Sequence, residues 1–216
     1  MGQPDLTISI DQSIAEQGFA IVSHVLSSAE IAELSAALKH VDDAVAVRSR
    51  GDVYAIRNLL DMVPEVRKLA VSQAIRNLVE PILGQKAFPI RGVFFDKTPE
   101  ANWKVAWHQD VSITVQEKRE VPGFGPWSTK AGVLHVQPPV EILERMLTLR
   151  IHLDACTESN GPLRVIPKSH LKGRLNSDQI RAYREMAEVV YVLGRNRWCG
   201  DDATITPPCL ICLTNA

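Results

Sequence analysis

The sequence predicts an α+β fold, because helical patterns fill its first third and many short strands follow them. Its 216 residues are enough for one domain with a sizeable core. Hydrophobic residues make up 45% of the chain and charged residues 23%, as in ordinary globular proteins. No linker-like stretch divides the chain, so we expect a single domain over residues 1–216 that is built on a β-sandwich or barrel.

The N-terminal part predicts one strand followed by helices. Phe19 to Leu26 is a short apolar run typical of a strand entering the fold. Ser27 and Glu30 have the spacing of a capping box, which begins a helix. The apolar residues that follow lie on one helical face: Ile31, Leu34 and Leu38.

A second helical stretch runs from Val63 to Leu83, with a break expected near Ser72. Gly84 would end it, because glycine favours the position just after a helix. From Phe88 onward the pattern changes to strands, with one helical insertion from Ser177 to Ala187. The expected strands are Ile90 to Asp96, Leu147 to Leu153, Leu163 to Ile166 and Val189 to Leu193.

Composition excludes several classes of function. The net charge is −1 and no block of Lys or Arg stands out, so nothing predicts a nucleic-acid surface. No apolar run approaches the roughly 18 residues of a membrane span, and the polar N-terminus does not resemble a signal peptide. Cys209 and Cys212 have C-x-x-C spacing without a second ligand pair. We therefore expect reduced thiols in a cytoplasmic protein.

The most suggestive chemistry lies in Trp107-His108-Gln109-Asp110. Side chains two positions apart on a strand point to the same side, so His108 and Asp110 are expected to converge. An imidazole and a carboxylate form two-thirds of the facial triad that binds Fe(II). Taken alone, an H-x-D pair is weak evidence, since a simple His–Asp contact explains most such pairs.

The run from Asn160 to His170, NGPLRVIPKSH, resembles the N-G-P-L-x-V-x-P-G-S-H segment of the phytanoyl-CoA dioxygenase family. That family also carries an upstream H-Q-D like residues 108–110 and a preceding strand like Phe94 to Pro99. The resemblance covers roughly residues 15–175. It implies a double-stranded β-helix (jelly roll) core with flanking N-terminal helices, and the cofactors Fe(II) and 2-oxoglutarate. His108 and Asp110 match the first two iron ligands.

The third family ligand is a histidine on a late strand. Gly200-Asp201 begins the corresponding pattern and Pro207 stands at its proline, but the histidine position falls on or near Ile211. The family's arginine for the distal carboxylate of 2-oxoglutarate would come later still. We therefore expect the C-terminal strands to be incomplete, through truncation or a changed reading frame. His152 is a weak substitute ligand, and His170 is expected to be structural.

The resemblance also suggests residues around the metal. Arg57 and Arg150 fall near cosubstrate positions, and an arginine fork suits a carboxylate. Trp107, Trp127 and His135 are candidates for packing or for substrate contacts, and the segment from Val111 to Pro139 is expected to set substrate choice. Within it, Gly123 to Pro139 is expected to be a long irregular loop.

Three readings of function stay open. The first is an Fe(II)- and 2-oxoglutarate-dependent dioxygenase that hydroxylates a small organic substrate. The second is a non-catalytic or defective relative without a complete iron site. The third is a jelly-roll binding protein in which a divalent metal has a structural role. The sequence does not determine the oligomeric state.

Overall fold

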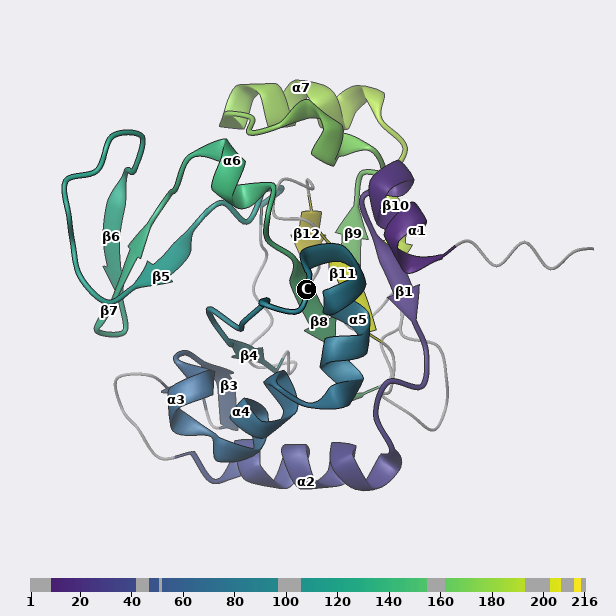
Figure 1. Cartoon of the computed structure of the whole chain (residues 1–216), viewed down its shortest axis with the longest axis vertical. Helices are drawn as coiled ribbons and strands as arrows, with labels where there is room; N and C mark the ends of the chain where they lie inside the picture. The colour runs from purple at the N-terminus through teal and green to yellow at the C-terminus, as the bar shows by residue number, and fades with distance from the viewer. Residues whose placement is uncertain are drawn as a thin grey trace, which may run out of the picture.

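The structure, a computed structural model, consists of antiparallel sheets flanked by helices, as the sequence predicts (Figure 1). Four three-stranded sheets lie between a helix along one end of the molecule and a layer of N-terminal helices at the other. The residues that the structure describes are 9–41, 47–50, 52–96, 106–154, 162–192, 203–206 and 212–214.

The first sheet joins segments from both ends of the chain, in the order β1–β11–β8. Its central strand, β11 (Ala203–Thr206), pairs antiparallel with β1 (Ala20–Val22) on one side and with β8 (Thr148–Ile151) on the other. Two strands expected from the sequence are therefore present but shorter than predicted, because only part of each predicted run pairs.

The second sheet has β9 (Leu163–Val165) at its centre, with β10 (Val190–Val192) and β12 (Cys212–Thr214) on its two sides. Val165 lies opposite both Val190 and Cys212 in the register. Leu163 and Val165 are buried, which explains why this short apolar run folds as an internal strand.

Helices cover these sheets with their apolar faces. α1 (Ile10–Gln17) and α5 (Gln73–Leu83) share a hydrophobic cluster with strands β1 and β8. The members of that cluster that are fully buried are Ile14, Ala20 and Leu78.

The other N-terminal helices are α2 (Ser28–Lys39), α3 (Leu59–Met62) and α4 (Pro64–Ala70). They pack with a third sheet, β2–β3–β4, around buried Leu38, Ile56, Leu59 and Val63. The strands of that sheet are β2 (Val47–Arg50), β3 (Asp52–Ile56) and β4 (Phe94–Phe95).

Local signals for these helices are confirmed. The Ser27 hydroxyl accepts from the Glu30 amide, and the Glu30 carboxylate accepts from the Ser27 amide, which completes the capping box. The long helical stretch is broken where expected, because Ser72 caps the start of α5 and Gly84, with φ 82°, follows its end.

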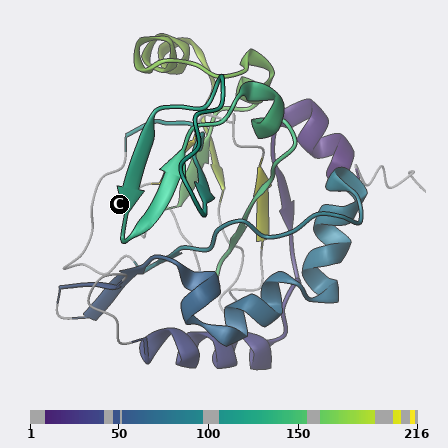
Figure 2. The ribbon, with the colours of Figure 1, turned by 60° about the vertical axis from the view of Figure 1, so that its left-hand side comes forward.

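The fourth sheet corrects one expectation. Residues 123–139 are not a long irregular loop, because they contain β6 (Trp127–Lys130) and β7 (Val133–Val136), and β7 also pairs with β5 (Ile113–Val115). Ala131 and Gly132 form the two-residue turn between them, with φ 49° and 75°. Figure 2 shows this sheet at the side of the molecule, below α7 and above the N-terminal helices.

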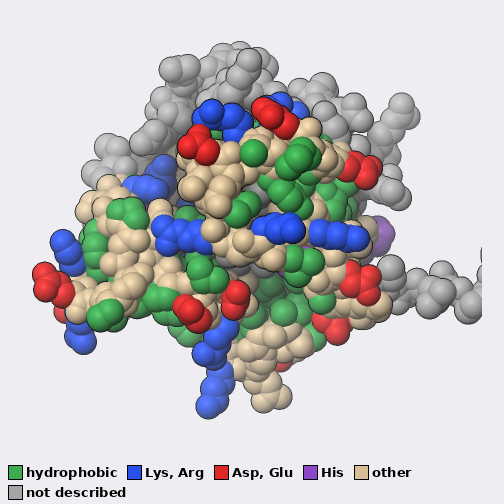
Figure 3. Space-filling model, turned by 90° about the horizontal axis from the view of Figure 1, so that it is seen from above, with side chains coloured by type: hydrophobic (Ala, Val, Ile, Leu, Met, Phe, Trp, Pro, Cys, Tyr) green, Lys and Arg blue, Asp and Glu red, His purple; other side chains and the backbone are tan. Residues whose placement is uncertain are grey.

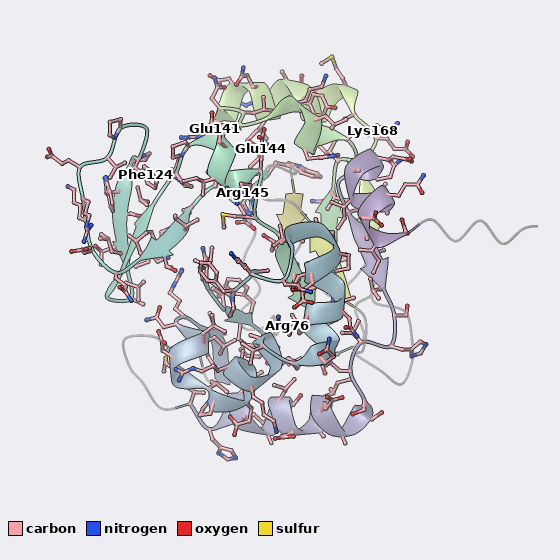
Figure 4. The ribbon with its side chains drawn as sticks, viewed as in Figure 1. Arg76, Phe124, Glu141, Glu144, Arg145 and Lys168 are labelled. Atoms are coloured by element: carbon pink, nitrogen blue, oxygen red, sulfur yellow. The ribbon has the colours of Figure 1, made fainter. Side chains whose placement is uncertain are left out.

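α6 (Val140–Leu143) leads from this sheet toward β8, and Figure 4 shows Glu141, Glu144 and Arg145 on it or just after it. A 3-10 turn, η2 (Ser169–Lys172), precedes α7 (Ser177–Met186), which lies along the top of the molecule. Seen from above, that face carries Lys/Arg and Asp/Glu side chains interspersed (Figure 3). Among the described residues, none of the helices has the length and apolar character needed to cross a bilayer.

Candidate metal and cosubstrate site

The structure places the side chains of His108 and Asp110 together, just ahead of β5. His108 Nε2 lies 3.8 Å from Asp110 Oδ1, and the two side chains are 37% and 53% exposed. His108 Nδ1 lies 2.8 Å from the Ala106 carbonyl oxygen. Because a carbonyl only accepts, Nδ1 carries the proton in the neutral imidazole, and that tautomer leaves the lone pair a metal ion needs on Nε2.

The two donors lie within reach of one divalent metal ion. Their separation is too long for a hydrogen bond. Bonds from a metal ion such as zinc to imidazole nitrogen or carboxylate oxygen are about 2.0–2.2 Å, so one ion can contact both donors, and neighbouring ligand positions would bring the donors closer than 3.8 Å. One imidazole and one carboxylate match part of the facial triad of Fe(II).

A third protein ligand does not join this pair in the described part of the chain, where no group of three or more His, Cys, Asp or Glu gathers. The expected third position near Ile211, together with Gly200-Asp201 and Pro207, lies outside the described residues. His152 is buried near the end of β8. His170 Nε2–H donates to the Ala15 carbonyl at 3.1 Å, so His170 ties the turn after β9 to α1.

Gln109 has a role that the sequence analysis missed. Its side chain is only 7% exposed. Its amide nitrogen donates to the Gly173 carbonyl at 2.8 Å, and its amide oxygen accepts from the Leu175 amide at 2.8 Å. Period-two alternation was the available signal, since the residue between two convergent ligands must face the other way.

The two tryptophans are held by cations and by packing. Trp107 packs against buried Ile166 and Ile180, and the guanidinium carbon of Arg164 lies 5.5 Å from its ring centre. Trp127 begins β6, and Lys118 Nζ lies 5.9 Å from its ring centre. Both distances are typical of cation–π contacts, and the Trp107 ring is also packed into the fold.

Arg57 and His135 meet in a narrow pocket between β3 and the fourth sheet. The residues that line this pocket are Arg57, Asn58, Arg91, Val93, Thr114 and His135. Two of the side chains that line it are guanidinium groups, those of Arg57 and Arg91. Arg150 does not belong to this lining; it lies on β8 opposite Thr204 of β11. The structure therefore does not bring the two expected cosubstrate arginines into one pocket.

The sequence analysis placed His135 in a long loop, and this was wrong. His135 belongs to β7 and is 3% exposed. Its Nδ1–H donates to the Val133 carbonyl at 2.9 Å. Burial lowers the pKa of His135; that hydrogen bond opposes the change, and the charges of Arg91, Lys130 and Arg57 lower the pKa further. The imidazole is therefore neutral near pH 7, with Nε2 as an acceptor.

Solved structures of low sequence identity share this fold. EctD from S. alaskensis, solved with 2-oxoglutarate and 5-hydroxyectoine, matches with a TM-score of 0.71 and 18% identity over 100% of this chain and 73% of that chain. SnoK, a non-heme alpha ketoglutarate dependent carbocyclase from nogalamycin biosynthesis, matches with a TM-score of 0.68 and 18% identity, over 100% of this chain and 81% of that chain. AviO1 from Streptomyces viridochromogenes Tue57 matches with a TM-score of 0.64 and 21% identity, over 97% of this chain and 88% of that chain.

These matches define the class: the chain has the jelly-roll fold of non-haem iron oxygenases. The model of the phytanoyl-CoA dioxygenase family matches residues 14–194, so the chain belongs to that family. No curated protein sequence matches the chain.

Proposed function

We propose that this protein is an Fe(II)- and 2-oxoglutarate-dependent dioxygenase that hydroxylates a small organic substrate. The observation that carries the proposal is the pair His108 Nε2 and Asp110 Oδ1, 3.8 Å apart, in a member of this family. When bound, Fe(II) and 2-oxoglutarate would supply oxygen activation coupled to oxidative decarboxylation.

The roles of the chain's own groups follow from their positions. His108 and Asp110 would hold the metal, and the bond from His108 Nδ1 to Ala106 would keep the ring in the ligating tautomer. A carboxylate of 2-oxoglutarate would be bound either by Arg57, which lies with Arg91 in the narrow pocket, or by Arg150 on β8. His135 would present a neutral acceptor to a bound molecule, and Trp107 and Trp127 would contribute walls. A cytoplasmic location is part of the proposal.

A second candidate is a non-catalytic relative, and a specific observation favours it: Ile211 stands where the family's third ligand is expected. Two protein ligands hold iron less firmly than three. We therefore expect slow turnover rather than efficient catalysis.

The test is succinate release. The purified chain is loaded with Fe(II) under anaerobic conditions, 2-oxoglutarate is added, and succinate is measured after oxygen is admitted. We expect slow release from the wild type and only background release from His108→Ala and Asp110→Ala. Asp61→Asn, which changes a carboxylate exposed on α3, is the control and should match the wild type. Background release from the wild type would support the non-catalytic candidate instead.

A further inference from the structure

Gln109 is the one residue between the two proposed ligands, and it is fastened at both ends of its amide. The Nε2 atom donates to the Gly173 carbonyl and the Oε1 atom accepts from the Leu175 amide, each at 2.8 Å. These partners are main-chain atoms that lie 64 and 66 residues further along the chain. A buried amide with a donor and an acceptor bond of good geometry has little freedom to rotate.

That bonding constrains the neighbouring side chains through the backbone. Successive side chains of an extended segment alternate in direction, so a fixed Gln109 sets where His108 and Asp110 point. If the amide loses its partners, the backbone between Trp107, which stays packed, and β5 loses one of its restraints. The 3.8 Å approach of His108 to Asp110 would then be one arrangement among several.

The segment that receives Gln109 is itself held in place. Leu175 packs in the cluster around buried Ile166 and Ile180, which also takes the Trp107 ring. Asn176 caps α7 by accepting from the Asp178 and Gln179 amides. The two hydrogen bonds of Gln109 therefore join the segment of the proposed metal ligands to a packed part of the fold.

We propose that Gln109 is a positioning residue, which, through its paired bonds to residues 173 and 175, fixes His108 and Asp110 in a metal-binding arrangement. The inference rests on the proposed function, because it assigns Gln109 to the same site. Gln109 is not assigned as a metal ligand, since both ends of its amide are already bonded to main-chain atoms.

Direct metal binding by the full chain tests this positioning role, with Co(II) as the probe and its visible absorption as the signal. Gln109→Met keeps the length of the side chain and removes both bonds. We expect it to weaken Co(II) binding about 10–100-fold, the range typical for partners that orient metal ligands. Gln109→Glu keeps the acceptor for Leu175 and should bind Co(II) more tightly than Gln109→Met.

A simple loss of stability must be separated from a positioning effect. Leu38→Ala removes a buried side chain of the N-terminal cluster, in another part of the molecule, and serves as the matched control. It should lower the thermal midpoint and leave the Co(II) affinity unchanged. Equal Co(II) affinity in the wild type and Gln109→Met would overturn the inference.

A metal-free measurement keeps the inference and the proposed function apart. The ring resonances of His108 are followed by NMR at pH 8 without metal. We expect them to move in Gln109→Met and to stay in place in Leu38→Ala; unmoved resonances in Gln109→Met would overturn the inference. A wild type that binds no Co(II) would refute the proposed function, and the resonances alone would then decide the role of Gln109.

Discussion

Lys168 stands in a left-handed backbone conformation, with φ 63° and ψ 2°, at the turn that follows β9 (Figure 4). The phytanoyl-CoA dioxygenase pattern has glycine at this place in the turn, and glycine alone adopts such angles without a steric cost. The turn is nevertheless held, because the Lys168 amide donates to the Gln17 carbonyl at 2.8 Å. The conformation is therefore imposed on Lys168 by the surrounding fold.

Lys168→Gly should consequently stabilise the protein. Relief of the left-handed strain, roughly 1–2 kcal/mol, outweighs the entropy cost of glycine, so we expect the free energy of unfolding to rise by about 0.5–1 kcal/mol. Urea denaturation measures the change. Lys172→Gly, four residues on and without a positive φ, should lower the same free energy by about 0.5–1 kcal/mol. Equal losses in the two variants would show that Lys168 is not strained.

His135 predicts how stability depends on pH. Its pKa is lowered in the folded protein, chiefly by burial, so the unfolded chain takes up a proton first as the pH falls. The contribution of His135 to stability is complete above about pH 6.5, the unfolded pKa, and decreases below it by at most about 1.4 kcal/mol per pH unit. Unfolding of the wild type and of His135→Asn between pH 5 and 8 measures this, and the wild type should have the steeper acid loss. If the unfolding free energies of the two proteins changed in parallel with pH, the lowered pKa of His135 would be contradicted.

At the scale of elements, the β6–β7 hairpin depends on its two-residue turn. Ala131 and Gly132 both have positive φ, which is the geometry of a type I′ turn. The Asn58 side chain donates to the Ala131 carbonyl at 3.1 Å and so ties the turn to the start of α3. Errors in this turn would therefore displace β7 and its pocket residue His135.

The prediction for this element uses a pair of variants. Gly132→Val places a branched side chain at φ 75° and should cost roughly 1–2 kcal/mol of unfolding free energy. Ala131→Asn, the residue that tolerates positive φ best after glycine, should be neutral or stabilising. Thermal unfolding followed by circular dichroism compares the two. A stabilised Gly132→Val would show that the turn has another conformation.

The β6–β7 hairpin could not be predicted from the sequence, whereas the helix boundaries could. The capping box at Ser27 and the break at Ser72 are local signals, and both are confirmed. The turn at Ala131-Gly132 lacks the usual Asn-Gly or Asp-Gly pair, and its strands have only four residues each. The Gly and Pro residues around these strands therefore led the sequence analysis to predict a loop. The segment forms a sheet because β7 pairs with β5, and that pairing is a tertiary contact.

For the whole molecule, the fold class and the family follow from the sequence because the NGPLRVIPKSH run together with the upstream H-Q-D is specific to the family. His108 and Asp110 could be named as ligand candidates only with that resemblance, because their spacing alone is weak evidence. Two other features could not be predicted, because each joins segments far apart in the chain. They are the hydrogen bonds from Gln109 to residues 173 and 175 and the pocket that Arg57 shares with Arg91 and His135. No local pattern encodes such contacts.

The pairing of β1 with β11 has a consequence for how the protein reaches its native state. Ala20 finds its partner Ile205 only near the other end of the chain, and Lys168 reaches back to Gln17. Contacts of such long range are slow to form, because the entropy of closing a long loop is lost before the contact contributes. During synthesis, β1 gains its partner β11 only after the residues between them have been made, so the first sheet is completed late and chaperones have a long interval in which to act.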